Sequence, residues 1–298
     1  MRDLACTLLV AALAMSCGKP SSSNDPAKTA PSAAPSPQPS ASAKPAFVSC
    51  GALDCRAYAD LAAAFESTLA DKPEVVAVGE AHAKKGFESV DTAAKRFTTE
   101  LLPRLEGRTE GLLLELMSAG QGCEKAAKAT GKELGKVAVN QAATAPNEYV
   151  TLGKTAEKLG IRVSQLHPSC KELAEIAKAK SPPVAILKTI TSLTARDVGL
   201  ALAAPNRAAD KMFFIYGGAF HGEPDPPEER AEFSFAPTVS KAAKGRYVSV
   251  HLFVREYIDA SWEMWPWYAH YKADAHPDKV TVFHPKPRHY VIITAAAK

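Results

Sequence analysis

The sequence lacks the features that define several large classes of protein. The apolar run Leu4–Met15 is shorter than the roughly 20 residues that a helix needs to span a bilayer. The six cysteines include no Cys-x-x-Cys pair of the zinc-binding type, and no internal repeat recurs at a solenoid period. The net charge is only +4 and the lysines are scattered, so nothing indicates a nucleic-acid partner. These absences exclude a membrane-spanning helix in that run, a zinc ribbon, a solenoid and a nucleic-acid-binding face.

The first residues have the composition of a secretory signal. Residues 1–16 contain one arginine, an apolar run and a small residue, Ser16, before Cys17. Residues 14–17 are similar to a lipobox, which implies cleavage before Cys17 and a lipid on its thiol. Gly18 follows instead of aspartate, which favours the outer membrane. We therefore expect an exported bacterial lipoprotein that faces the periplasm or the cell surface and contacts the membrane through its N-terminal lipid. An ordinary cleaved signal with a leftover cysteine is the alternative.

A tether and one folded domain follow the predicted cleavage point. Residues 17–46 are rich in proline, serine and alanine and contain no aromatic side chain. Such a segment buries too little apolar surface to offset its conformational entropy, so we expect an extended spacer. Residues 47–298 have the length of a single α/β domain, and the 46% hydrophobic content of the chain suffices for a core. The oligomeric state is not indicated.

The cysteines of the mature chain form an even set, Cys50, Cys55, Cys123 and Cys170. In an oxidising compartment disulfides are the expected state of such a set. The short spacing between Cys50 and Cys55 suggests one pair, although four cysteines also allow other connectivities and a metal site is a further alternative.

The domain alternates apolar runs with amphipathic helical patterns. This alternation predicts an α/β fold with a central parallel or mixed sheet flanked by helices. Near the C-terminus, short apolar segments follow one another without long helices, which predicts added, partly antiparallel strands. The predicted strands of the first kind are 74–79, 111–116, 161–166 and 211–218, those of the second kind are 247–254, 279–283 and 290–294, and the main predicted helices are 58–69, 87–106, 148–159, 170–180 and 184–203.

Polar residues stand at the ends of the predicted parallel strands. Glu80 and His82 follow the first strand, Glu115 closes the second, His167 follows the third, and His221 follows the fourth. Because ligands bind beyond the carboxyl ends of the strands in open parallel sheets, these side chains predict a site at one sheet edge. His167 is the weakest member and is expected to be an ordinary loop histidine.

Two imidazoles and a carboxylate can support two kinds of chemistry. His82, Glu115 and His221 are a donor set that suits a divalent transition metal such as manganese, cobalt or zinc. A metal held there would lower the pKa of its bound water. Without a metal, a histidine can act as general base while Glu80 or Glu115 orients it or protonates a leaving group.

Four segments resemble a known superfamily. Residues 78–82, the acid in residues 113–115, the Arg-Asp pair in residues 194–201, and residues 218–221 look like the motifs of the ChaN/Tiki/TraB/erythromycin-esterase group, in the same order. Tiki-like members imply metal-dependent proteolysis, erythromycin esterases imply acid–base chemistry by His and Glu, and ChaN implies haem binding by a lipoprotein. The chain departs from the esterase motifs, which have threonine before the first histidine, and lacks the Gly-Thr opening of Tiki-like proteins.

The resemblance assigns roles only to the residues that match the motif positions of this group. The resulting expectation is a hydrolase of an ester or amide in a small molecule or peptide, assisted by a metal. The alternatives are a haem- or iron-binding protein without turnover and a member that retains only the fold. The residues are Glu80, Glu115, Arg196 and Asp197 for catalysis, with Arg196 stabilising charge, and His82, Glu115 and His221 for the metal.

The aromatic segment Trp262–Tyr271 allows two interpretations. It can form a lid over a ligand or a wall against haem, or it can pack a long loop onto the sheet. We expect the second arrangement.

Overall fold

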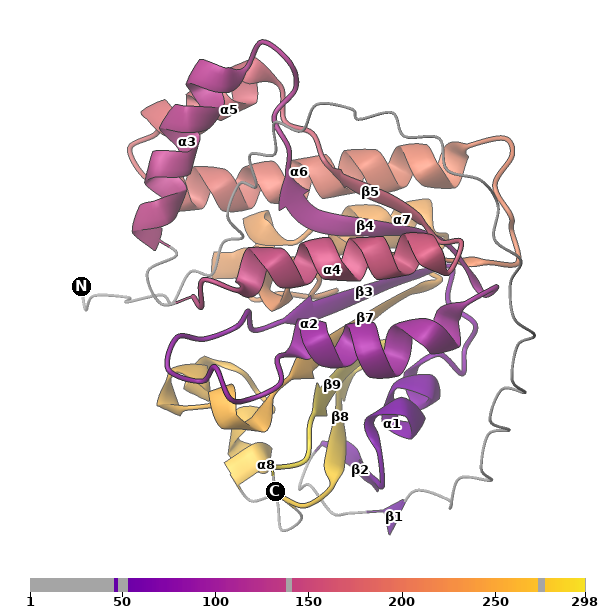
Figure 1. Ribbon diagram of the computed structural model, residues 1–298. Helices are drawn as coiled ribbons and strands as arrows, with labels where there is room; N and C mark the ends of the chain where they lie inside the picture. The colour runs from indigo at the N-terminus through magenta and orange to yellow at the C-terminus, as the bar shows by residue number, and fades with distance from the viewer. Residues whose placement is uncertain (1–45, 48–52, 138–140, 273–276, 298) are drawn as a thin grey trace, which may run out of the picture.

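The computed structural model describes residues 46–47, 53–137, 141–272 and 277–297 (Figure 1). The predicted signal peptide, Cys17, the tether up to residue 45, and Cys50 lie outside these ranges. Among the helices described, none is long and apolar enough to cross a membrane.

The described strands form one nine-stranded mixed sheet in the order β1-β2-β8-β9-β7-β3-β6-β4-β5. The strands from β9 to β5 run parallel, whereas β8 is antiparallel to both β9 and β2. The predicted α/β class is therefore confirmed, including antiparallel pairing near the C-terminus. The bounds are β1 (Ala46–Phe47), β2 (Asp54–Tyr58), β3 (Val75–Glu80), β4 (Thr109–Met117), β5 (Arg162–Leu166), β6 (Met212–Gly218), β7 (Tyr247–Phe253), β8 (Val280–Lys286) and β9 (His289–Ile293).

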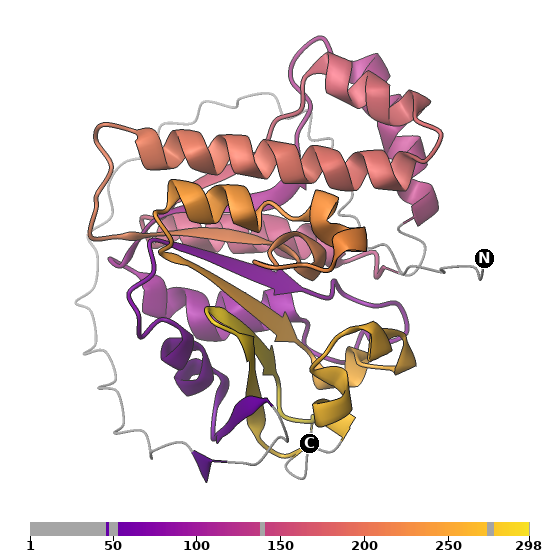
Figure 2. The same ribbon diagram turned by 180° about the vertical axis from the view of Figure 1, so that it is seen from behind.

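Helices cover both faces of the sheet (Figures 1 and 2). One face carries α1 (Leu61–Thr68), α2 (Ala93–Arg96) and α4 (Ala145–Lys158), and the other carries α6 (Pro182–Ala203) and α7 (Ala236–Ala242). The helices α3 (Glu124–Val137) and α5 (Cys170–Lys178) pack on one another beside one end of α6, and α8 (Tyr268–Lys272) lies in the C-terminal part.

Strand β3 shows why the central strands are apolar throughout. Val76 and Val78 belong to the core under α1 and α4, while Val75 and Ala77 belong to the core under α6 and α7. A parallel strand with helices on both faces has no solvated side, so every position along it is buried.

The second predicted helix begins later than its pattern suggests. Thr92 caps the helix by accepting a hydrogen bond from the Lys95 backbone N–H at 3.0 Å, so α2 starts at residue 93 instead of 87. The helical path then continues through a π-helical turn (Phe97–Leu101) and a 3₁₀ turn (Leu102–Leu105). Pro103 lacks an amide donor, which is compatible with the end of regular α-helical bonding here.

The first predicted helix is also shorter than expected. Tyr58 belongs to β2, which pairs with β8, and the helix starts after Asp60, whose carboxylate accepts from the Ala63 N–H at 2.7 Å. The pairing partner of β2 lies more than 200 residues away in sequence, so no local pattern indicates it.

A disulfide joins Cys123 and Cys170, which are 47 residues apart. It connects the segment before α3 to the first residue of α5. Cys55 is disulfide-bonded as well. These bonds confirm the expectation of disulfides, whereas the pairing of Cys50 falls outside the described residues.

The aromatic segment packs onto the sheet, as the favoured interpretation predicts. Trp265 and Trp267 are buried, and the Trp267 ring stacks on Phe253 of β7 with centroids 5.4 Å apart. The segment thus forms a third hydrophobic cluster over β7, β8 and β9.

Candidate functional site

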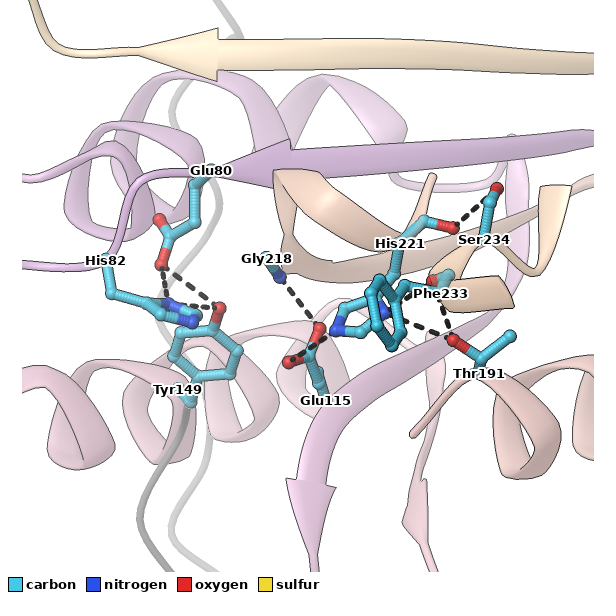
Figure 3. Close-up of polar contacts among 9 residues, drawn as sticks. All are labelled: Glu80, His82, Glu115, Tyr149, Thr191, Gly218, His221, Phe233 and Ser234. Atoms are coloured by element: carbon cyan, nitrogen blue, oxygen red, sulfur yellow. Dashed lines mark hydrogen bonds and ion pairs between the residues drawn. The ribbon is translucent and has the colours of Figure 1, made fainter. Parts of the chain in front are cut away.

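Four of the six predicted site residues converge where β3, β6 and β4 end side by side (Figure 3). Glu80 is the last residue of β3, Glu115 lies near the end of β4, and His221 belongs to η3, the 3₁₀ turn Ala219–His221 that follows β6. With His82 they form a buried group whose exposed fractions are between 1% and 5%. Four ionisable side chains at this depth need specific partners, because burying an unpaired charge is costly.

Glu80 holds His82 in one orientation. The carboxylate Oε1 lies 2.9 Å from His82 Nδ1, and Oε2 accepts a hydrogen bond of 2.6 Å from the Tyr216 hydroxyl. The hydroxyl of Tyr149 on α4 donates to Glu80 Oε1 at 3.0 Å and lies 3.1 Å from His82 Nδ1. This arrangement places the proton of a neutral His82 on Nδ1 and leaves the Nε2 lone pair free.

The surroundings of His82 favour its protonated form. Burial is the largest influence and lowers the pKa, but the hydrogen bond and charge of Glu80, with smaller contributions from Glu115 and Glu148, outweigh it. The pKa of His82 is therefore raised above its ordinary value. Burial and the charge of Glu80 also raise the pKa values of Tyr149 and Tyr216 well above the usual value, so both remain hydrogen-bond donors at neutral pH.

Replacing Glu80 with glutamine is expected to lower the pKa of His82. The substitution removes the negative charge that stabilises the imidazolium while keeping a hydrogen-bonding group of the same size. The measurement is a pH titration of the His82 ring signals by NMR. Glu148→Gln is the matched control and should lower the pKa less, because Glu148 acts only through space. Equal titration curves for Glu80→Gln and the unchanged protein would contradict the assignment.

Glu115 and His221 form the second half of the site. The Gly218 N–H donates to Glu115 Oε2 at 2.8 Å, while Oε1 has no hydrogen-bond partner among the described residues and lies 3.9 Å from His221 Nε2. His221 Nδ1 donates to the Phe233 carbonyl at 2.8 Å, and the Thr191 hydroxyl lies 3.3 Å from the same nitrogen. His221 Nε2 therefore faces the carboxylate of Glu115.

Glycines keep open the space between the two halves. A Cβ on Gly218 would lie 3.6 Å from His82 Nε2 and 3.8 Å from both carboxylate oxygens of Glu115. His82 Nε2 has no partner within the described part of the chain, so two unpartnered buried atoms border the same point. A Cβ on Gly217 would lie 2.2 Å from Glu115 Oε2, so that position must be glycine for Glu115 to occupy its place.

A small cavity borders Glu115 on the α6 face. Its lining includes Thr194, Gly217, Gly222 and Phe235, and its volume is about 10 Å³. This volume admits one water molecule. A substrate reaching the same carboxylate has to displace the segments that cover the site.

The loop that carries His82 is one such cover. Its Ala83 carbonyl accepts from the Ala142 N–H at 2.8 Å, and Lys84 forms an ion pair of 2.5 Å with Asp259. The Phe87 ring packs edge-on against Tyr257 with centroids 5.4 Å apart. Ala83, Ala142 and Tyr257 are buried, whereas the Lys84–Asp259 ion pair is exposed, so opening this loop would have to break both buried and exposed contacts.

The side chains of His82, Glu115 and His221 are of the types that bind a divalent metal, but they are not arranged around a common point. Each imidazole has its Nδ1 held, His82 by a carboxylate and His221 by a carbonyl, which is how proteins orient histidine ligands. Yet no group of three or more His, Cys, Asp and Glu side chains in the described ranges is arranged to hold a metal ion. Binding of a metal would therefore require these side chains to move closer to one another.

The structure does not bring Arg196 and Asp197 to this group. Arg196 Nε pairs with Asp197 at 2.7 Å on the surface of α6, and Arg196 Nη2 contacts the His167 carbonyl at 3.4 Å. No hydrogen bond or ion pair described here joins either residue to His82, Glu115 or His221. His167 is exposed, as expected of a loop histidine.

Sequence reasoning missed the two tyrosines of the site. Tyr216 lies in the apolar strand β6 and Tyr149 lies on the buried side of α4. A buried tyrosine hydroxyl needs a hydrogen-bond partner, so a tyrosine inside an apolar strand, such as Tyr216, indicates a polar group close by. That requirement was the one signal available without the structure.

No family model, curated protein or solved structure matches this chain. The resemblance to the ChaN/Tiki/TraB/erythromycin-esterase group therefore stays a prediction.

Proposed function

We propose that this domain is an extracytoplasmic, membrane-anchored hydrolase of an ester or amide bond. The observation that carries the proposal is the pair of buried, unpartnered atoms, His82 Nε2 and Glu115 Oε1, around the space left by Gly218. The Cys123–Cys170 disulfide supports an oxidising compartment, in agreement with the predicted signal and the lipid on Cys17.

In the proposed reaction His82 is the general base. Its Nε2 takes a proton from a water molecule that also donates a hydrogen bond to Glu115 Oε1. The water oxygen forms a bond to the carbonyl carbon as the C=O π electrons move onto the carbonyl oxygen, giving a tetrahedral oxyanion. Glu80 stabilises the imidazolium through Nδ1–H, as a carboxylate does in other His–carboxylate pairs. The oxyanion electrons then re-form the C=O bond as the bond from carbon to the leaving oxygen or nitrogen breaks. The same Nε2–H protonates that leaving atom, which returns His82 to the neutral state.

A divalent metal fits the same residues by donor chemistry. His82, Glu115 and His221 would hold it, and it would supply a bound water of lowered pKa. Metal content measured by elemental mass spectrometry on the full chain, before and after loading with manganese, cobalt or zinc, tests this part. About one equivalent that is absent from the His82→Ala/His221→Ala variant supports a metal-assisted reaction. No metal in either protein leaves the metal-free base mechanism.

Gly218→Ala is expected to lower hydrolysis by about 100-fold without unfolding the protein. The new methyl group would meet its neighbours at ordinary contact distances, and Gly218 has φ −69° and ψ 142°, which alanine adopts freely. The methyl group would, however, occupy the space between His82 and Glu115. The measurement is kcat/KM together with the thermal unfolding midpoint. Gly120→Ala, whose added Cβ meets nothing within 4 Å, is the control; undiminished activity in Gly218→Ala would rule out this space as the reaction centre.

The substrate class is tested with a panel of small esters, amides and peptides. Hydrolysis that depends on His82 supports the proposal. A Soret band on haem titration, lost in His82 or His221 variants and unaccompanied by any hydrolysis, would instead favour haem binding of the ChaN type.

A further inference from the structure

A second buried polar cluster lies outside the proposed catalytic site. It consists of His251 on β7, His289 at the start of β9, and the pair Glu223 and Arg230 from the segment after η3. Trp265 joins the two pairs, because its ring contacts both the Arg230 guanidinium and the His251 ring, the latter with centroids 5.4 Å apart. All four residues are at most 5% exposed. None of them takes part in the reaction proposed above.

Arg230 has more donors than the described residues satisfy. Its Nη2 pairs with Glu223 Oε2 at 3.0 Å, but Nε and Nη1 are buried and have no hydrogen-bond partner there. The guanidinium lies 4.3 Å from the centroid of the Trp265 ring and 5.5 Å from that of Phe220. Arginine stays charged in proteins, so these open N–H groups need an acceptor.

The two histidines add one donor and one acceptor. His289 Nε2 and His251 Nδ1 lie 3.4 Å apart, so one nitrogen donates to the other. The outer nitrogens, His251 Nε2 and His289 Nδ1, are both unpartnered and buried. Whichever tautomers are present, a neutral pair leaves one outer N–H and one outer lone pair. Burial lowers the pKa of His289 to about 3 and that of His251 well below the ordinary value, so the pair is neutral near pH 7.

The proposed catalytic site and this second cluster lie on opposite sides of the turn η3. A Cβ on Gly79 would lie 2.6 Å from Ala219 Cα and 3.2 Å from His251 Cδ2, so the turn sits directly on β3 beside His251. His221 of this turn faces Glu115, while Phe220 packs on Arg230 and Trp265. The close packing at Gly79 separates the two clusters.

We propose that Arg230, His251 and His289 form a second binding site, which takes a small oxyanion of the carboxylate or phosphate type. The unpartnered N–H groups of the Arg230 guanidinium can only donate hydrogen bonds, so they select an acceptor such as an ionised oxygen. The aromatic rings of Trp265 and Phe220 hold the guanidinium in place, so little side-chain entropy is lost on binding.

The test measures binding of inorganic phosphate and of acetate to the full chain, by titration calorimetry and by thermal unfolding at constant ionic strength with chloride as the reference salt. A ligand that binds only the folded state produces a saturable rise in the unfolding midpoint. A response to phosphate alone assigns a phosphate-type ligand, and a response to acetate assigns a carboxylate. No saturable response to either anion would overturn the proposal and leave the cluster hydrated by water.

Variants locate the bound anion. Arg230→Lys keeps the charge but removes the planar set of donors, so affinity is expected to fall at least about tenfold. Arg246→Lys is the matched control, because Arg246 pairs with Glu74 at 2.7 Å at the opposite ends of the strands; its affinity should be unchanged. If Arg230→Lys does not fold, His289→Gln takes its place. Unchanged affinity in the folded variant would place the anion elsewhere. The readout does not involve hydrolysis, so its outcome is independent of the proposed reaction.

Discussion

Replacing His82 with glutamine is expected to lower kcat/KM for the hydrolysed ester or amide by about 10²–10⁴-fold, the usual contribution of a general base. Glutamine can still hydrogen-bond to Glu80 but cannot take a proton from water. The measurement compares kcat/KM across pH with the thermal unfolding midpoint of the same preparation.

The pH dependence of the unchanged protein provides a second readout of the same residue. His82 acts as a base only when neutral, so activity should rise as pH increases through its pKa, which lies above the ordinary value. Glu80→Gln lowers that pKa and should move this rise to lower pH, even though the maximal rate falls.

The control for His82→Gln is His167→Gln, on an exposed loop histidine outside the site. It should retain full activity. If His82→Gln folds normally and hydrolyses the substrate as fast as the unchanged protein, His82 is not the base and the proposed mechanism is wrong.

Replacing Gly79 with alanine is expected to destabilise the domain by about 3 kcal/mol, at the upper end of overpacking effects. The added Cβ would lie 2.6 Å from the backbone Cα of Ala219 and 3.3 Å from its Cβ. A backbone atom in a buried turn cannot rotate away as a side chain does. The turn η3 would have to lift from β3, which displaces His221 as well.

Chemical denaturation checks this value, with Gly199→Ala on the surface of α6 as the control. A Cβ at Gly199 meets nothing within 4 Å, and alanine is the better helix former by about 1 kcal/mol, so this variant should be slightly more stable. If Gly79→Ala unfolds at the same denaturant concentration as the unchanged protein, the turn does not pack on β3 as described.

The turn η3 contributes to both sites, so a variant that displaces it should affect both. A change that lifts the turn should disturb both His221 and the packing of Phe220 on Arg230. We therefore expect Gly79→Ala to weaken hydrolysis and anion binding together, whereas Gly218→Ala should affect hydrolysis alone.

Local sequence patterns were sufficient to predict the strands in the parallel part of the sheet. Strands such as β3 and β4 are apolar at consecutive positions because helices cover both of their faces, and that composition is visible in a short window. Strand β2 was missed because it is short and pairs with β8 from the other end of the chain. The late start of α2 depends on the Thr92 cap, whereas hydrophobic spacing alone suggested an earlier start.

The sequence by itself determined the α/β class, the sheet edge that carries the polar residues, and Glu80, His82, Glu115 and His221 as the residues found there. These follow from strand periodicity and from the rule that parallel strands end at a common edge. Only the tertiary structure decided that Tyr149 and Tyr216 hold Glu80, that Arg196 and Asp197 form a surface pair, and that Arg230 lies over Trp265. The tyrosine and arginine contacts join residues distant in sequence, and the exposure of the Arg196–Asp197 pair depends on which side of α6 faces away from the site. Both are set by how the helices and turns pack on the sheet and not by the local pattern of any one segment.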